Sequence, residues 1–481
     1  MRVRFLLVVL LIAAVLGFVG YYKLFRELPA ERFASDEQHF LYGSIGTEAS
    51  DGVPYWIWLV LPRVFPDLLP GPGGWASVGF FTEEGHPLPV GLSRRTVGID
   101  RVGINCAFCH AGTYRLEPTA KVVLVATAPS TRMDPQAYAK FMQACAQDPR
   151  FAAGPIMAEI AKNTNLSWLD RQIYRYILIP LTKRELLKQR RVHTNYGWMY
   201  EQPPWGRGRI DPFNPIKYRL LHQPVDGTIG HSDMQPLWNQ KQHTNYQLHW
   251  DGLNNSLNEV IITSALGDGA TKKWVDSDWA KAEGESSLKR IRKLITDTPA
   301  PKYPMPIDAA TAAKGKVLYD RDCAQCHAFG GARTGRIEPL DSAQLNTDRH
   351  RLDMWTENAA KAYNEHAAGY SWKMVAYKKT NGYVNVPLDG IWLRAPYLHN
   401  GSVPTLADLL EAPSDRPKVF YRGYDVIDPA KVGFLTDGPE AERTGFRFDT
   451  AVAGNGNGGH LWGTALASED KRALVEFMKT L

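Results

Sequence analysis

The stretches Cys106-Ala-Phe-Cys-His110 and Cys323-Ala-Gln-Cys-His327 decide how the rest of this chain is interpreted. A Cys-x-x-Cys-His motif makes physical sense as one turn of helix: its thiols add to the two vinyl groups of a porphyrin and its histidine reaches the iron. A zinc site would not need a histidine after both cysteine pairs, and a redox dithiol would favour a strand-helix-strand setting. The sequence therefore predicts two covalently bound haem c groups, held by Cys106, Cys109, Cys323 and Cys326, with His110 and His327 as iron ligands.

The bulk composition fits a globular protein of several domains. The chain has 481 residues, enough for two or three domains, and five cysteines. The fifth, Cys145, is interpreted as a small buried apolar residue, because five cysteines do not form a disulfide framework. The formal net charge of +6 is largely cancelled by the propionates of two haems, so no nucleic-acid binding is inferred.

The N-terminus predicts a membrane anchor. Arg2 and Arg4 precede an apolar run, Phe5–Tyr22, whose 18 residues exceed a usual signal-peptide core and approach the minimum for a membrane span. Since no small-x-small cleavage site follows, the pattern favours an uncleaved anchor over a cleaved signal peptide or a buried helix. Haem c is attached outside the cytoplasm, which predicts the periplasmic side of the inner membrane for the rest of the chain.

The fold class that follows is mainly α, with two tandem cytochrome-c-like haem domains, a loop-rich N-terminal extension and the anchor. The proline-rich run Pro299–Pro306 cannot continue a helix and acts as a spacer. We therefore expect an anchor at 1–27, an N-terminal haem domain with its extension at 28–298, a linker at 299–307 and a C-terminal haem domain at 308–481. Residues 28–102 read as loop with short helices.

Helices are expected at five places, and the last two have N-capping residues, Asp308 and Ser468. The expected helices are Pro135–Ala146, Trp168–Gln189, Ser286–Ile295, Ala309–Tyr319 and a C-terminal helix after Ser468. The basic run Lys183–Arg191 could touch anionic lipid, but an ordinary exposed helix face is the favoured interpretation.

The ligand at the sixth position of each iron decides the function. An iron with two strong protein ligands only passes electrons, whereas one with an open sixth position can bind peroxide or oxygen. Three short stretches rich in aromatic residues and glycine supply candidate ligands, although a lone histidine in such a turn is more often a surface or hydrogen-bonding residue. The candidates are His249 within Leu248–Leu257, His399 within Leu393–Leu406 and His460 within Gly454–Gly463.

Two of these stretches resemble segments of the bacterial di-haem cytochrome c peroxidase superfamily. They are Trp250-Asp-Gly252 followed by Ser256-Leu257, and Arg394-Ala-Pro-Tyr-Leu-His-Asn-Gly401. The superfamily includes the peroxidases, the tryptophan-tryptophylquinone-forming di-haem enzyme and the rubber-oxygenase-type cytochromes. From about Phe40 onward, the chain resembles the rubber-oxygenase branch more closely. The stretches that carry this resemblance are Tyr42–Gly46, Gly52–Trp58, Asp211–Pro215 and the glycine-rich loop around His460.

This resemblance implies that the two haems have different roles. The N-terminal haem would be the reactive one, with His110 behind it, a pocket in front, and His249 able to close that pocket. The C-terminal haem would transfer electrons, held by His327 and a second histidine, with His460 preferred over His399. Trp250 would lie between the haems and help electrons or radicals pass. The implied partners are peroxide or dioxygen and a redox protein such as a small cytochrome or a cupredoxin.

Departures from the peroxidase pattern keep the alternatives open. Leu253 stands where the peroxidases have arginine, their downstream Glu-Met pair is not found, and no methionine or tyrosine ligand is evident after His399. Peroxidase activity and a calcium ion between the domains therefore stay open. An oxidoreductase of the peroxidase or oxygenase type is favoured over a pure electron carrier with both irons six-coordinate, and over haem as a structural or sensing element.

Overall fold

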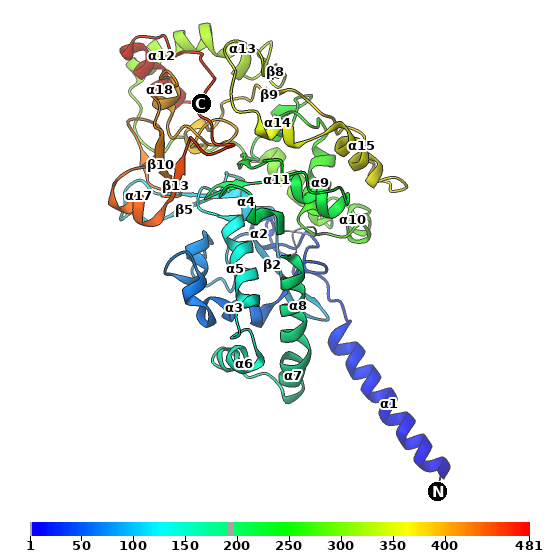
Figure 1. Cartoon of the computed structure of the whole chain (residues 1–481). Coiled ribbons are helices and arrows are strands. Elements are labelled where there is room, and N and C mark those ends of the chain that lie inside the picture. Colours follow the sequence, from blue (N-terminus) through cyan, green and yellow to red (C-terminus); the bar gives the residue numbers. More distant parts are fainter. Residues whose placement is uncertain (1, 191–196) are drawn as a thin grey trace.

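The chain begins with a helix that stands apart from the rest. The computed structural model describes residues 2–190 and 197–481, and α1 (Arg2–Leu24) runs away from the body of the molecule (Figure 1). None of the helices in this described part combines the length and apolarity that crossing a bilayer requires. The predicted N-terminal anchor is therefore wrong. The 18-residue apolar run rises about 27 Å as a helix, which falls short of a hydrocarbon core roughly 30 Å thick.

Residues 36–126 form short helices and two small antiparallel sheets. In order these are α2 (Asp36–Tyr42), β1 (Val53–Pro54), α3 (Tyr55–Val64), η1 (Pro66–Leu68), η2 (Gly74–Val78), β2 (Leu92–Val97), β3 (Ile99–Ile104), α4 (Ala107–His110), β4 (Ala111–Tyr114) and β5 (Val123–Ala126). The first sheet has the order β1-β3-β2, with Leu92 opposite Ile104, and β4 pairs with β5. The predicted loop with short helices misses the β2–β3 hairpin. Its turn residue Gly98 has φ +73°, and a Cβ there would lie 2.0 Å from the Leu24 carbonyl oxygen.

The next part, residues 135–297, combines helices with turns and short strands. It contains α5 (Pro135–Gln147), α6 (Ala153–Ala161), α7 (Trp168–Ile173), the π-turn η3 (Tyr174–Leu178), α8 (Ile179–Gln189), η4 (Gly197–Tyr200), β6 (Arg209–Ile210), η5 (Ile216–Leu220), β7 (Ser232–Asp233), η6 (Gln240–His243), α9 (Leu257–Gly267), α10 (Lys272–Trp279) and α11 (Ser287–Asp297). The helices predicted at 135–146, 168–189 and 286–295 are confirmed. The π-turn lies just before Pro180, which has no N–H to donate into the helix ladder. The basic run Lys183–Arg191 continues along α8, and its last residue lies outside the described residues.

The C-terminal part alternates short helices with two-stranded sheets. It contains α12 (Ala309–Asp322), α13 (Ala324–His327), β8 (Ile337–Pro339), α14 (His350–Met354), α15 (Glu357–His366), β9 (Gly382–Val384), η7 (Ile391–Leu393), α16 (Leu406–Leu409), β10 (Val419–Arg422), β11 (Ile427–Asp428), β12 (Gly433–Phe434), α17 (Gly438–Thr444), β13 (Phe446–Asp449) and α18 (Ser468–Met478). α12 and α18 lie side by side (Figure 1). Gly315 permits this approach, because a Cβ there would meet the Ala473 carbonyl oxygen at 1.9 Å. Asp308 caps α12 as predicted, whereas the N-cap of α18 is Ala467 and not Ser468.

The predicted mainly α fold class is also wrong. The chain is 41% helix and 11% strand, and the strands form one three-stranded and five two-stranded antiparallel sheets in the described part. The 32 prolines and 41 glycines of the chain give the physical reason. Proline removes a helix donor and glycine disfavours helix, so helices stay short and the segments between them pair as small antiparallel sheets.

The hydrophobic core joins segments that lie far apart in the sequence. One core cluster combines Phe40 and Ile261 with Trp355 and Tyr377, and so contains residues from both sides of the proline-rich run. A second cluster is built around Trp58 and Phe141, and a third around Trp392 and Leu474. The domain bounds at 298 and 308 stay predictions.

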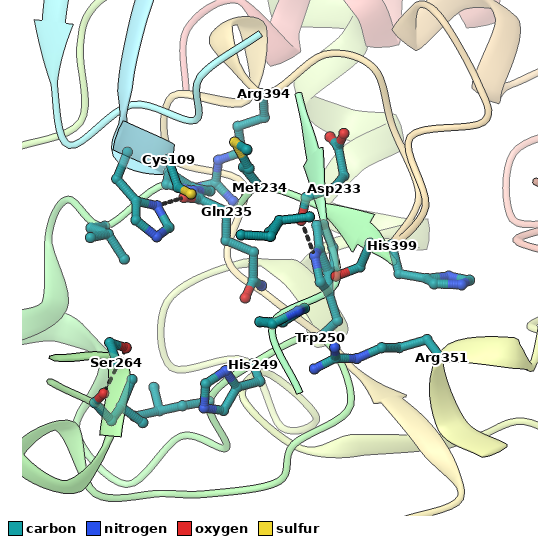
Figure 2. Close-up of a pocket in the computed structure, with 18 of the residues that line it drawn as sticks. Cys109, Asp233, Met234, Gln235, His249, Trp250, Ser264, Arg351, Arg394 and His399 are labelled. Atoms are coloured by element: carbon teal, nitrogen blue, oxygen red, sulfur yellow. Dashed lines mark hydrogen bonds between the residues drawn. The ribbon is translucent and has the colours of Figure 1, made fainter. Parts of the chain in front are cut away.

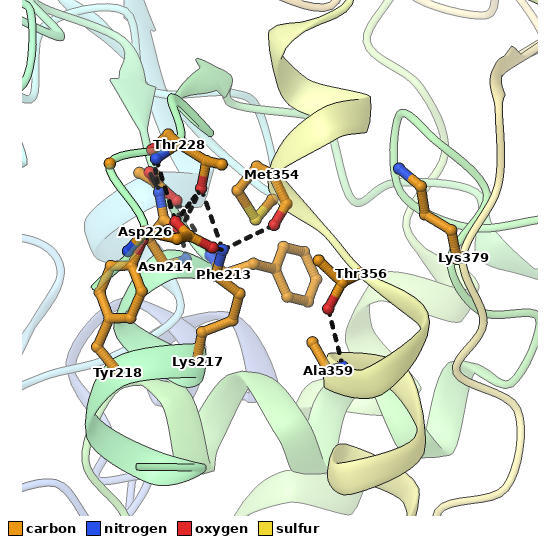
Figure 3. Close-up of polar contacts among 12 residues, drawn as sticks. Phe213, Asn214, Lys217, Tyr218, Asp226, Thr228, Met354, Thr356, Ala359 and Lys379 are labelled. Atoms are coloured by element: carbon orange, nitrogen blue, oxygen red, sulfur yellow. Dashed lines mark hydrogen bonds and ion pairs between the residues drawn. The ribbon is translucent and has the colours of Figure 1, made fainter. Parts of the chain in front are cut away.

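A buried lysine holds two of these distant segments together (Figure 3). Lys217, in η5, has a side chain with no solvent exposure, and its Nζ donates to the Thr228 hydroxyl at 3.0 Å and to the Met354 carbonyl oxygen at 2.8 Å. The same ammonium forms an ion pair with Asp226. The network fixes the end of α14 against the segment that carries Phe213, a residue of the site described below.

Lys217→Met should lower the free energy of unfolding by about 2 kcal/mol, because three buried or half-buried acceptors lose their donor. The measurement is the urea midpoint followed by circular dichroism. The matched control is Lys361→Met. Lys361 is 77% exposed, and its contact with Glu365 is long, at 4.0 Å. The loss of this side chain should therefore leave the urea midpoint unchanged. Equal midpoints for Lys217→Met and wild type would show that the network does not stabilise the fold.

Candidate functional site

One cavity brings the two Cys-x-x-Cys-His motifs together. It has a volume of about 600 Å³, in the size range of cofactor sites. All ten residues that the sequence nominates line it: Cys106, Cys109, His110, His249, Trp250, Cys323, Cys326, His327, His399 and His460. Several of them are drawn in Figure 2. Residues separated by more than three hundred positions in the sequence therefore meet in one internal space.

Each motif folds as a single helical turn. These turns are α4 and α13, and in both the first cysteine is the N-cap residue and the histidine ends the helix. Asn105 sets the start of α4: its side-chain oxygen accepts from the Ala107 N–H, and its amide nitrogen donates to the carbonyl oxygens of Leu41 and Gly43. Before α13, the chain arrives directly from α12, of which Cys323 is the C-cap. The four thiols are unpaired, as covalent attachment to a porphyrin requires.

The two motif histidines are held in the same way. His110 Nδ1 lies 2.7 Å from the Gln235 carbonyl oxygen, and His327 Nδ1 lies 2.7 Å from the Val386 carbonyl oxygen. A carbonyl oxygen only accepts, so the proton of each ring sits on Nδ1 and Nε2 keeps its lone pair. This is the tautomer that binds a metal through Nε2.

The carbonyl partners were missed by the sequence reasoning. Gln235 and Val386 each stand before a Pro-Leu dipeptide, 125 and 59 residues after their motif histidines. A proline restricts the residue before it to extended backbone, which fixes the direction of that carbonyl. The following leucines, Leu237 and Leu388, also line the cavity. A repeated x-Pro-Leu after each motif was the available signal.

Burial keeps the cavity histidines neutral. Desolvation by burial lowers the pKa of His110 and of His249 to about 4, and that of His399 and of His460 to about 3. The pKa of His327 is lowered for the same reason. At neutral pH these imidazoles are uncharged, and an uncharged imidazole is the form that binds iron.

The distances distinguish the two candidate partners of His327. The ring centroids of His327 and His460 are 6.2 Å apart. Two imidazoles on opposite sides of one metal, each with a metal–nitrogen bond of about 2 Å, have centroids roughly 6 Å apart. His399, in contrast, is stacked on Tyr383 with centroids 4.1 Å apart, and its Nε2 lies 3.0 Å from the Tyr383 hydroxyl. The geometry favours His460 as the partner of His327.

His249 faces the cavity from the first half of the chain (Figure 2). Its Nε2 is buried and has no hydrogen-bond partner among the described residues, and its backbone is left-handed with φ +64°. Phe213 meets it edge-on, with ring centroids 5.2 Å apart. Phe213 belongs to the Asp211–Pro215 stretch, and sequence reasoning did not give it a role in the site. A buried nitrogen with a lone pair and no partner is unusual, and it fits a group that belongs in the cavity.

Trp250 lies beside His249, between it and His399 in the view of Figure 2. Its indole N–H donates to the Asp233 carbonyl oxygen at 2.8 Å, and its own carbonyl oxygen accepts from the Val384 N–H at 2.8 Å. The next residue, Asp251, is fully buried and paired with Arg351 through two contacts of 3.2 Å. The bond to Asp233 orients the indole, and the other bonds hold the backbone around Trp250.

Two further expectations concern the surroundings of the site. Cys145 is fully buried in the second core cluster, as predicted. Within residues 2–190 and 197–481, no group of three or more His, Cys, Asp or Glu side chains is arranged to hold a metal ion. In these residues, therefore, no such cluster supports the expected calcium ion.

Comparisons with known proteins agree with a cytochrome-c-like segment. Residues 382–421, which include His399, match the family described as RoxA-like, cytochrome c-like. This match supports a relationship to rubber-oxygenase-like c-type cytochromes, whose domain implies covalently bound haem c and a role in oxidation–reduction or electron transfer. It does not confirm membership of the wider di-haem peroxidase superfamily or the number of haems.

The curated relatives have no described activity in their names. The uncharacterized protein y4iJ of Sinorhizobium fredii is 47% identical over 104 residues, which are 20% of this chain and 17% of the relative. The uncharacterized protein y4iM of the same organism is 27% identical over 234 residues, 43% of this chain and 50% of the relative. The chain thus spans half or less of the length of the curated relatives it matches.

Proposed function

We propose that this chain is a di-haem c-type cytochrome oxidoreductase of the oxygenase or peroxidase type, with a reactive N-terminal haem and an electron-transferring C-terminal haem. The proposal rests on one observation: His110 and His327 are held by the same arrangement of contacts. Each bonds through Nδ1 to a carbonyl oxygen before a Pro-Leu dipeptide, and each lines the same cavity. A haem, when bound, supplies an iron that changes oxidation state by one electron.

The residues of the second half are suited to hold an electron-transferring haem. Cys323 and Cys326 would attach it, His327 would bind the iron, and His460 would bind from the other side. Two neutral imidazoles leave no position for a small molecule, so this iron would only store and pass electrons. Trp462 packs on the His460 ring, with centroids 5.2 Å apart, and limits its rotation.

The residues of the first half are suited to a haem with a reactive face. Cys106 and Cys109 would attach it and His110 would bind its iron. Phe213 and the neutral imidazole of His249 would face the other side. Dioxygen or peroxide would bind there, and His249 Nε2 could contact it, because this nitrogen has no other partner in the described chain.

Trp250 is the group proposed to connect the two centres. Its indole is flat and oxidisable, and the bond to the Asp233 carbonyl oxygen orients it. We place the protein in the periplasm, because haem c is attached outside the cytoplasm. There a small redox protein, such as a cytochrome or a cupredoxin, would exchange electrons with the second haem.

A pure electron carrier is the second candidate function, and one observation favours it. His249 is neutral, buried and without a partner on Nε2, which are also the properties of an iron ligand. If His249 bound the first iron, both haems would be six-coordinate and no substrate could reach either.

Exchanging the two candidate ligands of the second haem tests its proposed role. His460→Ala should convert that haem from low-spin to high-spin, because the iron loses its sixth ligand. His399→Ala is the matched control: it removes a buried imidazole of the same cavity that is already bonded to Tyr383, and should leave the haem low-spin. Magnetic circular dichroism of the oxidised protein reports both spin states. The opposite pattern would assign the second haem to His399.

A further inference from the structure

A buried arginine joins the loop of His460 to the rest of the second half. Arg416 is 1% exposed. Its five donors meet five backbone carbonyl oxygens, those of Leu409, Glu411, Asn457, Gly459 and His460 itself, at 2.7–3.2 Å. A guanidinium group has five N–H donors, so none is left over for a carboxylate. The cation therefore serves the backbone alone.

The carbonyl oxygens belong to two separate segments. Leu409 and Glu411 lie at the C-terminal end of α16, where helix carbonyls lack partners within the helix. Asn457, Gly459 and His460 belong to the glycine-rich loop. Arg416 thus ties the end of α16, whose Leu406 and Leu409 line the cavity, to the loop that presents the His460 ring.

The loop needs such a tie. His460 has φ +50°, a left-handed conformation that a side chain with a Cβ rarely adopts. At Gly459 a Cβ would lie 1.9 Å from the Leu345 carbonyl oxygen, so the loop also presses closely on the chain at 345–347. A residue held in this conformation keeps it only where surrounding bonds determine it.

We propose that Arg416 is a positioning residue for the second haem: its five bonds hold the His460 ring at the distance from His327 that iron ligation from both sides requires. The inference rests on the proposed ligation by His460.

The test compares Arg416→Lys with wild type as the haem-loaded protein. Lysine keeps the charge but has three donors, so at least two carbonyl oxygens lose their partner. The second haem should lose more than half of its low-spin signal, and added imidazole should restore it by replacing the displaced ring. Imidazole rescue would not follow from general destabilisation.

Arg207→Lys is the matched control. Arg207 is a half-buried arginine that also donates to backbone carbonyl oxygens, at 2.8 Å to Arg132 and 3.0 Å to Ser77, but it holds no part of the His460 loop. Its spectrum should equal that of wild type. A change in Arg207→Lys as large as in Arg416→Lys would show that any buried arginine has this effect, and would overturn the inference.

His460→Ala separates the inference from the proposed function beneath it. If His460→Ala becomes high-spin while Arg416→Lys stays fully low-spin, ligation stands and the role of Arg416 is refuted. If His460→Ala stays low-spin, the ligation itself fails. Should Arg416→Lys not fold, Asn457→Ala decides, because the Asn457 side chain fixes the same loop to the Pro417 carbonyl oxygen at 3.1 Å. A high-spin fraction in Asn457→Ala above that of wild type supports the inference, and an unchanged spectrum counts against it.

Discussion

Replacing Cys323 and Cys326 together by alanine should reduce the covalently bound haem from two groups per chain to one. Each Cys-x-x-Cys-His motif attaches its own porphyrin through two thioether bonds, and the two motifs are separate helical turns, α4 and α13. Cys106 and Cys109 would keep their haem. The measurement is haem per polypeptide in the alkaline pyridine assay, on protein denatured and washed with acidified solvent to remove any haem that is not covalently bound.

Cys145→Ala is the control for this experiment. Cys145 is a fully buried thiol in the second core cluster and lies outside both motifs, so its loss should leave two haems per chain. Two results would contradict the di-haem proposal. One is wild-type protein with one haem per chain; the other is a double variant at Cys323 and Cys326 that binds as much haem as wild type.

The sequence predicted the parts of the site that depend on local spacing. Two thiols and a histidine within five residues form one helical turn, and the turn places them together whatever the rest of the chain does. The helices at 135–146 and 309–319 were predictable for the same reason, because Asp134 and Asp308 cap them through bonds to backbone N–H groups two or three residues away.

The parts that depend on distant segments were not predictable in the same way. The carbonyl oxygens of Gln235 and Val386 reach the motif histidines only after the chain has folded back over 125 and 59 residues. The preference for His460 over His399 came from a resemblance. Its physical support, the 6.2 Å separation from the His327 ring and the bond between His399 and Tyr383, exists only in three dimensions.

Two predictions were wrong because they inferred tertiary structure from local composition alone. The apolar run near the N-terminus forms a helix, but its length and apolarity do not meet the requirement for a bilayer span. The aromatic, proline-rich stretch 28–102 has no sustained period, yet it includes β2 and most of β3. The pairing of these two strands, rather than hydrophobic alternation, defines the hairpin.

In the reduced protein, carbon monoxide should bind one of the two haems and leave the other unchanged. The second iron would be closed by His460, whereas the first would have an exchangeable position in front of Phe213 and His249. A titration followed by absorbance should therefore reach its end point at one carbon monoxide per two haems. His249→Ala should keep this stoichiometry, since an oxygenase or peroxidase site is open already.

The electron-carrier alternative gives a different pair of results. If His249 binds the first iron, wild type should take up no carbon monoxide and His249→Ala should take up one equivalent. That outcome would replace the oxidoreductase proposal with a carrier. The two hypotheses predict different numbers of carbon monoxide molecules bound per chain. Slow binding therefore cannot make one hypothesis look like the other.

If the first haem does bind the external ligand, Trp250→Phe should slow electron transfer between the haems at least about tenfold, which corresponds to about 1.4 kcal/mol of activation free energy. Phenylalanine fills part of the space but is harder to oxidise than indole, and it loses the bond to the Asp233 carbonyl oxygen. Flash photolysis of carbon monoxide from the half-reduced protein measures the rate. Trp355→Phe is the matched control, because Trp355 is a fully buried indole packed on Phe213, 5.0 Å between ring centroids, and does not line the cavity. Equal slowing in both variants would mean that Trp250 only packs against its neighbours, and that electrons cross between the haems without it.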